Sequence, residues 1–269
     1  MTLGLTIQLP QILQSYHPQI EASIKPFIRI ITQPHAPLNY WQSKFGGVPY
    51  FPKDNLYPVD QHGAPLHLLA QLNFAEMPHI GHFPEKGILQ VYIAADDDLY
   101  GLDFDDQFSQ DKFRVIYFDT VIENESELLS DFSFLGNNQD GLTPITGEYG
   151  LQFELAYAPV SVGDANFSLL IGREAYDPAE DGEAFYEAYA AHFSEVGHKL
   201  GGYPFFTQSD PREYDDELKS FILLFQMDTD HTEGVDIMWG DSGVANFFIH
   251  PDALKRQDFS KVLYNWDCY

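Results

Sequence analysis

Two nine-residue stretches, Ser43–Phe51 (SKFGGVPYF) and His198–Phe206 (HKLGGYPFF), share the pattern Lys-x-Gly-Gly-x-Pro. Glycine adopts a positive φ at little steric cost, and proline fixes the exit from a turn into extended backbone. Each stretch is therefore expected to be a tight turn that leads into a strand.

The segments that follow these two turns also match one another, in the same order. Leu68–Asn73 (LLAQLN) corresponds to Leu223–Asp228 (LLFQMD), and Gly87–Ile93 corresponds to Gly243–Ile249. A fourth pair of blocks, Val115-Ile116-Tyr117 and Val262-Leu263-Tyr264, completes the series.

The register of these blocks argues against coincidence. Lys44 and Lys199 are 155 positions apart, Gln71 and Gln226 are also 155 apart, and Gly87 and Gly243 are 156 apart. The fourth pair is offset by 147 positions, so the segment before it is shorter in the second half. The pattern predicts internal duplication, with copies at approximately 40–119 and 195–268 joined by residues 120–194.

Composition favours a sheet-rich fold. Aromatic residues make up 15% of the 269 residues, with 22 Phe and 16 Tyr, and such side chains pack well on pleated surfaces. The alternation in Leu89–Ile93 is typical of a strand. We expect an α+β protein with a β-rich multi-sheet fold, made by duplication of one unit and containing few helices. No low-complexity linker interrupts the chain, which favours one pseudo-symmetric domain over residues 1–269.

Helical patterns are few. Leu9–Ser23 is expected to form a helix broken or kinked at Pro18, and Pro178–Val196 a clearer one. The inward face of the second helix would carry four residues: Phe185, Tyr189, His192 and Val196. Shorter helical turns are expected after His250-Pro251 and near Glu123–Leu129, and strands at Leu151–Leu155 and Phe167–Ile171.

The charge balance restricts the partners. There are 14 basic and 41 acidic residues, a formal net charge of −27, and the acids are spread along the chain. Nucleic acid and anionic membranes are bound through Lys/Arg clusters, so neither is expected as a partner. A basic protein or a cationic ligand would be attracted, although the same charge is also explained by solubility alone.

Cysteine usage and the chain start indicate a cytoplasmic protein. Cys268 is the only cysteine, which excludes an intrachain disulfide and a thiolate metal cage. Met1–Pro10 has no basic region followed by an apolar run. Neither a Gly-x-Ser-x-Gly elbow nor a phosphate-binding glycine loop occurs, and no cofactor is expected.

Metal binding has weak support in the sequence. His79 and His82 are three positions apart, with His67 upstream, but neighbouring prolines and a glycine argue against the helix that would bring the two rings together. Acidic runs at 96–106 and 228–241 lack the spacing of a calcium loop. Exposed loops are the expected outcome, with no metal site.

Two constellations could carry a binding site. Asp228, Asp230 and Asp241 surround Trp239 and could provide paired carboxylates beside an aromatic ring. The alternative is that Trp239 fills the core while Asp241 caps a turn before Gly243.

The second constellation is the matched polar set Lys44, Gln71, Lys199 and Gln226. If the two copies pack about a pseudo-twofold axis, these four side chains could converge on a shared ligand groove. Buried glutamines that satisfy irregular strands, and lysine stems that cover aromatic rings, would explain the same residues through the fold alone.

The chain resembles the YwqG-like family of bacterial proteins, a family of unknown function. The resemblance rests on Ser43-Lys44-Phe45-Gly46-Gly47-x-Pro49, Gly87-x-Leu89-Gln90, His198-x-Leu200-Gly201-Gly202-Tyr203-Pro204 with Gln208, and Met238-Trp239-Gly240-Asp241-Ser242-Gly243 continuing to Phe247-Phe248-Ile249. It implies an α+β multi-sheet fold and brings no catalytic mechanism.

Three functions remain open on these grounds. The first is a non-enzymatic acidic binding or interaction protein, such as an immunity or inhibitor protein. The second is a carboxylate-dependent hydrolase or sugar-active enzyme that uses the acids near Trp239. The third is small-ligand binding in the groove between the copies.

Overall fold

The computed structural model describes residues 8–34, 38–136, 142–178, 181–194 and 196–269. Over these residues it contains one antiparallel sheet of ten strands in the order β10-β9-β8-β7-β1-β6-β2-β3-β4-β5. The strands are β1 (Lys25–Gln33), β2 (Lys44–Gly46), β3 (His67–Asn73), β4 (Ile88–Ile93), β5 (Phe113–Phe118), β6 (Glu148–Ala158), β7 (His198–Gly201), β8 (Ile222–Asp228), β9 (Val244–Ile249) and β10 (Val262–Asp267). The sheet is thus continuous, where the sequence predicted several sheets.

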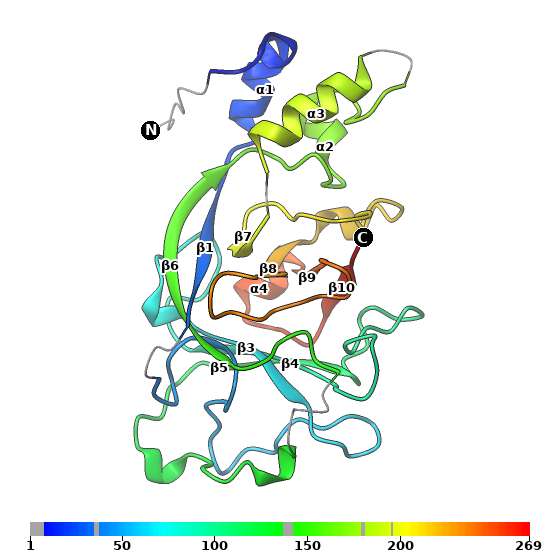
Figure 1. Cartoon of the computed structure of the whole chain (residues 1–269). Helices are drawn as coiled ribbons and strands as arrows, with labels where there is room; N and C mark the ends of the chain where they lie inside the picture. The colour runs from blue at the N-terminus through cyan, green and yellow to red at the C-terminus, as the bar shows by residue number, and fades with distance from the viewer. Residues whose placement is uncertain (1–7, 35–37, 137–141, 179–180, 195) are drawn as a thin grey trace.

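The sheet has two four-stranded parts. Strands β2 to β5 form the first meander (residues 44–118), and strands β7 to β10 form the second meander (residues 198–267). The long strands β1 and β6 pair with each other between them, and β6 pairs with β2 while β1 pairs with β7. Figure 1 shows β1 and β6 running side by side from the helical end of the molecule down to the first meander.

The two meanders have the same register. Lys44 pairs with Gln71 in the first, and Lys199 pairs with Gln226 in the second. The next strand pair of each meander has a register shift at the same place. It falls between Leu68 and Ala70 where β3 pairs with β4, and between Leu223 and Phe225 where β8 pairs with β9.

The sheet curls until its ends nearly meet. The rings of Phe45 on β2 and Phe225 on β8 lie 5.9 Å apart, although β7, β1 and β6 separate these strands in the sheet. The edge strands approach as well, because Phe113 on β5 lies 5.1 Å from Tyr264 on β10. The enclosed space is filled by one core cluster drawn from both meanders.

Four α-helices lie outside the sheet in the described part of the chain: α1 (His17–Ala22), α2 (Phe167–Ile171), α3 (Gly182–His192) and α4 (Pro251–Lys255). The first three gather at one end, shown at the top of Figure 1. They share a second core cluster that includes Ile20, Phe167 and Phe185. None of the helices described here has the length and apolar character needed to cross a membrane.

The two long helical predictions are right in place and wrong in detail. Gln11–Tyr16 is a 3₁₀ helix, and Pro18 lies in the first turn of α1, where its missing N–H costs nothing. In helix α3, Phe185 and Tyr189 face inward as expected, whereas His192 is exposed. The helix ends at His192, so Val196 lies beyond it and is 57% exposed. Residues 179, 180 and 195 of the predicted helix lie outside the described residues.

Phe167–Ile171 was predicted as a strand and is the helix α2. A five-residue run with four apolar side chains and Ser168 fits a buried strand or a buried helical turn equally well by periodicity. Gly172, with φ of 85°, supplies the left-handed residue that ends this helix. The strand at Leu151–Leu155 is part of β6, α4 follows His250, and the Glu123–Leu129 segment holds a 3₁₀ turn at Glu125–Glu127.

Candidate functional site

The matched glutamines support the chain in the same way in both meanders. Gln71 and Gln226 are fully buried. Gln71 Oε1 accepts a hydrogen bond from Tyr50 N at 2.7 Å, and Gln226 Oε1 accepts one from Phe205 N, also at 2.7 Å. Each amide thus ties the segment after its Gly-Gly turn to the sheet.

The structure brings each matched lysine beside its own glutamine. Lys44 and Gln71 lie on β2 and β3, Lys199 and Gln226 lie on β7 and β8, and β1 and β6 stand between the pairs in the sheet. The Gln71 amide donates to the carbonyls of Tyr40 and Gln42, whereas the Gln226 amide donates to that of Gly197. These bonds anchor two separate loops.

The acids around Trp239 are also placed by the fold. Trp239 is fully buried and lies edge-on to Tyr100, with 5.6 Å between ring centroids. Asp228 accepts hydrogen bonds from the backbone N–H groups of Gly197 and Thr229, and its burial raises the pKa of its carboxyl. Asp241 is exposed. With its ring inside the core, Trp239 has no face to offer a ligand.

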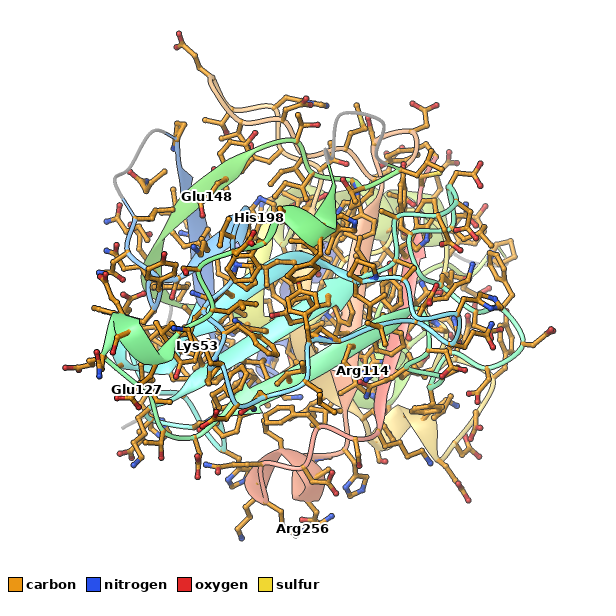
Figure 2. All side chains as sticks on the ribbon, turned by 90° about the horizontal axis from the view of Figure 1, so that it is seen from below. Lys53, Arg114, Glu127, Glu148, His198 and Arg256 are labelled. Atoms are coloured by element: carbon orange, nitrogen blue, oxygen red, sulfur yellow. The ribbon has the colours of Figure 1, made fainter. Side chains whose placement is uncertain are left out.

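An open cleft lies over Lys44. Its volume is about 550 Å³. The lining residues are Leu38, Asn39, Tyr40, Lys44, Val48, Glu125, Ser130, Phe132 and Glu148. We refer to it as the Lys44–Glu148 cleft, because Lys44 Nζ lies 2.9 Å from Glu148 Oε1; Glu148, on β6, is labelled in Figure 2.

Glycine allows this ion pair to form. Gly46 pairs with Glu148 across β2 and β6, and the neighbouring Gly47 has φ of 71°. A Cβ on Gly47 would come within 2.4 Å of Glu148 Oε1. The bare backbone therefore leaves room for the glutamate to lie across the turn and reach Lys44.

The corresponding position in the second meander is closed. There Gly201 pairs with Phe27, so an aromatic ring takes the place of Glu148. Lys199 Nζ lies 5.4 Å from the centroid of that ring and donates to Tyr203 O. Tyr203 is 2% exposed, whereas its counterpart Val48 is 41% exposed. One scaffold thus carries a filled site and an open one.

The open cleft is acidic. Among the described lining residues, Lys44 is the cation and Glu125 and Glu148 are the carboxylates, so the lining carries one net negative charge. Tyr40 and Phe132 are half-buried, so part of each ring faces the opening. Carboxylates beside aromatic faces attract a cation by charge and by cation–π interaction.

The buried His198 on β7 is part of a hydrogen-bond network with a structural role. His198 Nε2 lies 3.3 Å from Asp230 Oδ2, and Nδ1 of the same ring accepts a hydrogen bond from Asp228 N. Thr32 Oγ1 also donates to Asp230 Oδ2, at 2.8 Å. The hydrogen bond from His198 is the largest of the effects that hold the pKa of Asp230 well below its usual range. Because both ring nitrogens are occupied, His198 has no lone pair for abstracting a proton.

Arg212 forms a second closed network. Its guanidinium bonds to Asp164 and Asp210 and donates to Phe221 O, and it lies 4.2 Å from the ring centroid of Phe248. Arg212 and both aspartates are buried. The network clamps two loops together and leaves no access for a ligand.

The described residues contain no group of three or more His, Cys, Asp or Glu side chains arranged to hold a metal ion. His79 and His82 are exposed, and His67 is partly buried. In the acidic run at 96–106, Asp96 and Asp97 bond to Lys112 at 2.8 and 2.7 Å.

Of the residues that line this cleft, the sequence pattern singled out Lys44 and none of its neighbours. Glu148, Glu125 and Phe132 lie between the two meanders in the sequence, at 120–194, where no block of one half matches a block of the other. Strand alternation extended backward from Leu151 would have placed Glu148 on the same strand, but pairing with β2 is set by the tertiary fold.

The chain belongs to a protein family whose model matches residues 43–268 and is described as a domain of unknown function (DUF1963). The match covers both meanders, β6 and the helices α2 to α4. No curated protein matches the chain.

Proposed function

We propose that this protein is a non-enzymatic binding protein whose Lys44–Glu148 cleft receives a basic side chain of a protein partner. The observation that carries the proposal is the difference between the two meanders. In the second meander, Lys199 is covered by Phe27 and Tyr203. In the first, the matched Lys44 lines an acidic cleft that also contains aromatic rings.

Charge favours a basic partner both inside the cleft and over the protein as a whole. Within the cleft, Glu148 neutralises Lys44 and Glu125 adds a further negative charge. Around it, the net charge of −27 raises the rate of encounter with a basic surface. An immunity or inhibitor protein acting on a basic target is one class that uses this arrangement.

The proposal includes the origin of the scaffold. The matched registers of the two meanders, including the register shifts in β3 and β8, support internal duplication of one unit. After such a duplication, one lysine site would have been retained as an opening while the other became part of the core. We also propose that the protein is YwqG-like and that it is located in the cytoplasm.

The experiment uses a short peptide of alternating arginine and glycine, titrated into the protein by calorimetry. The control peptide carries citrulline, which keeps the shape of arginine without its charge. Glu125→Gln and Glu148→Gln should each weaken binding of the arginine peptide by about tenfold, which is roughly 1.4 kcal/mol.

Glu154→Gln is the matched control variant. Glu154 is also on β6, and its side chain is half-exposed. Its Oε2 lies 3.7 Å from Arg29 Nη1, and the residue does not line the cleft. It should change affinity less than about twofold, because a distant exposed charge is largely screened. Equal losses in all three variants, or equal binding of the citrulline peptide, would assign the effect to diffuse charge and reject the cleft.

A further inference from the structure

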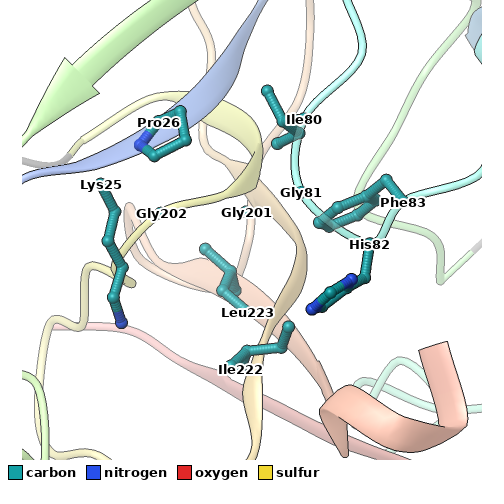
Figure 3. A pocket seen from close by; sticks show the side chains of 10 residues that line it. All are labelled: Lys25, Pro26, Ile80, Gly81, His82, Phe83, Gly201, Gly202, Ile222 and Leu223. Carbon is teal, nitrogen blue, oxygen red and sulfur yellow. The ribbon is translucent and has the colours of Figure 1, made fainter. Parts of the chain in front are cut away.

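A second, smaller hollow lies at the seam between the two meanders. It has a volume of about 190 Å³ and is lined by the start of β1, the 80–83 loop, the Gly201-Gly202 turn and the start of β8. Figure 3 shows Lys25 and Pro26 on one side, Ile80 and Phe83 opposite, and Ile222 and Leu223 between them.

The walls of this seam hollow are apolar and closely packed. Ile80, Phe83 and Leu223 are buried, at 7%, 8% and 1% exposure. Gly201 has φ of 69°, and a Cβ there would come within 2.9 Å of Ile80 Cδ1. The missing side chain therefore lets the turn approach the loop without filling the space beside it.

The opening carries basic groups. Lys25 and His82 both line the hollow, and both are exposed. Although Lys25 as a whole residue is exposed, its Nζ lies 4.3 Å from the centroid of the Tyr203 ring, and desolvation by burial lowers the pKa of this ammonium group. Asp164, the nearby carboxylate, is already bonded to Arg212 at 2.9 Å.

We propose that the seam hollow binds a small apolar carboxylate, with its hydrocarbon or aromatic part between Ile80, Phe83 and Leu223 and its carboxylate at Lys25. The size fits, since an apolar cavity of about 150 Å³ is enough for a benzene ring. The charge fits as well, because Lys25 lines the hollow and its ammonium would form an ion pair with a carboxylate there.

Benzoate is the probe, and benzyl alcohol is its uncharged counterpart of similar size. Titration followed by NMR should show benzoate binding in the millimolar range, about −4 kcal/mol, and benzyl alcohol about tenfold weaker. Lys25→Met should weaken benzoate by about tenfold and leave benzyl alcohol nearly unchanged, because the apolar stem is retained.

Two further variants locate the site. Ile222→Trp extends a partly buried wall residue into the hollow and should abolish the binding of both probes. Lys255→Met removes an exposed lysine of α4 outside the hollow and should change neither.

The absence of benzoate binding would overturn the proposal, and so would benzoate binding that persists in folded Ile222→Trp protein. Equal affinity for the two probes would reject the role of Lys25. Because this site shares no lining residue with the Lys44–Glu148 cleft, either proposal can fail without the other.

Discussion

Lys44 and Glu148 form an ion pair of unequal exposure: the lysine side chain is 4% exposed and the glutamate side chain 39%. Removing one partner or the other should therefore have different effects. Glu148→Ala leaves a buried ammonium without its carboxylate and should lower the free energy of unfolding by about 1–2 kcal/mol, less than for a fully buried pair.

Lys44→Met is the comparison variant, because it leaves only a half-exposed glutamate that water can solvate. It should change the free energy of unfolding by less than about 1 kcal/mol. Urea denaturation measures both values, and a larger loss for Lys44→Met than for Glu148→Ala would contradict this account of the pair.

Gln71→Leu should destabilise the protein and loosen the cleft. The substitution leaves Tyr50 N and the carbonyls of Tyr40 and Gln42 without their side-chain partner. The expected loss is about 3 kcal/mol or more, because each buried polar group left unsatisfied costs about 1–3 kcal/mol. Binding of the arginine peptide should weaken as well, since Tyr40 lines the cleft.

Gln226→Leu separates these two effects. It should also lower stability, because Phe205 N and Gly197 O lose their partner, yet it should leave peptide affinity unchanged in the folded protein. Denaturation and calorimetry on the two variants test this, and weaker peptide binding in Gln226→Leu would show that the two meanders are coupled.

Gly202→Ala should cost more stability than Gly63→Ala. Both glycines have positive φ, 71° and 83°, so an alanine is strained at either position. At Gly202 the new Cβ would also come within 2.8 Å of Phe27 Cβ, whereas at Gly63 it meets nothing within 4 Å. We expect a loss of about 1 kcal/mol at Gly63 and at least about 2 kcal/mol at Gly202. Similar melting temperatures for the two variants would contradict the packing argument.

Asp230→Asn should change the pH dependence of stability. The hydrogen bonds from His198 and Thr32 hold the pKa of Asp230 below its usual 3.8. A carboxyl with a lowered folded-state pKa stabilises the protein above its unfolded pKa, and this contribution is lost as the pH falls. The variant should therefore be less stable than the parent near neutral pH, and the difference should narrow below about pH 4.

Chemical denaturation at a series of pH values measures this difference. Thr32→Val serves as a partial control, because it removes one of the hydrogen bonds and keeps the charge of Asp230. A difference between Asp230→Asn and the parent that stays constant from pH 6 to pH 3 would show that the charge of Asp230 does not contribute.

Local sequence signals predicted the strands and turns well where residue type alone sets the backbone. The Gly-Gly turns have positive φ at all four glycines, and the blocks around Gln71 and Gln226 are buried strands. The same signals failed at Phe167–Ile171, where a short apolar run does not distinguish a strand from a helix, and at Val196, where the helix had already ended.

The sequence by itself determined the matched blocks, their spacing, and the need for glycine and glutamine at fixed points in each. These are local requirements, because a positive φ or a buried amide is satisfied by nearby backbone. Only the tertiary structure decided that β6 brings Glu148 to Lys44 while β1 brings Phe27 to Lys199. Strand pairing over a hundred residues or more depends on how the whole sheet closes, and no short-range pattern encodes which side chain then lies opposite each lysine.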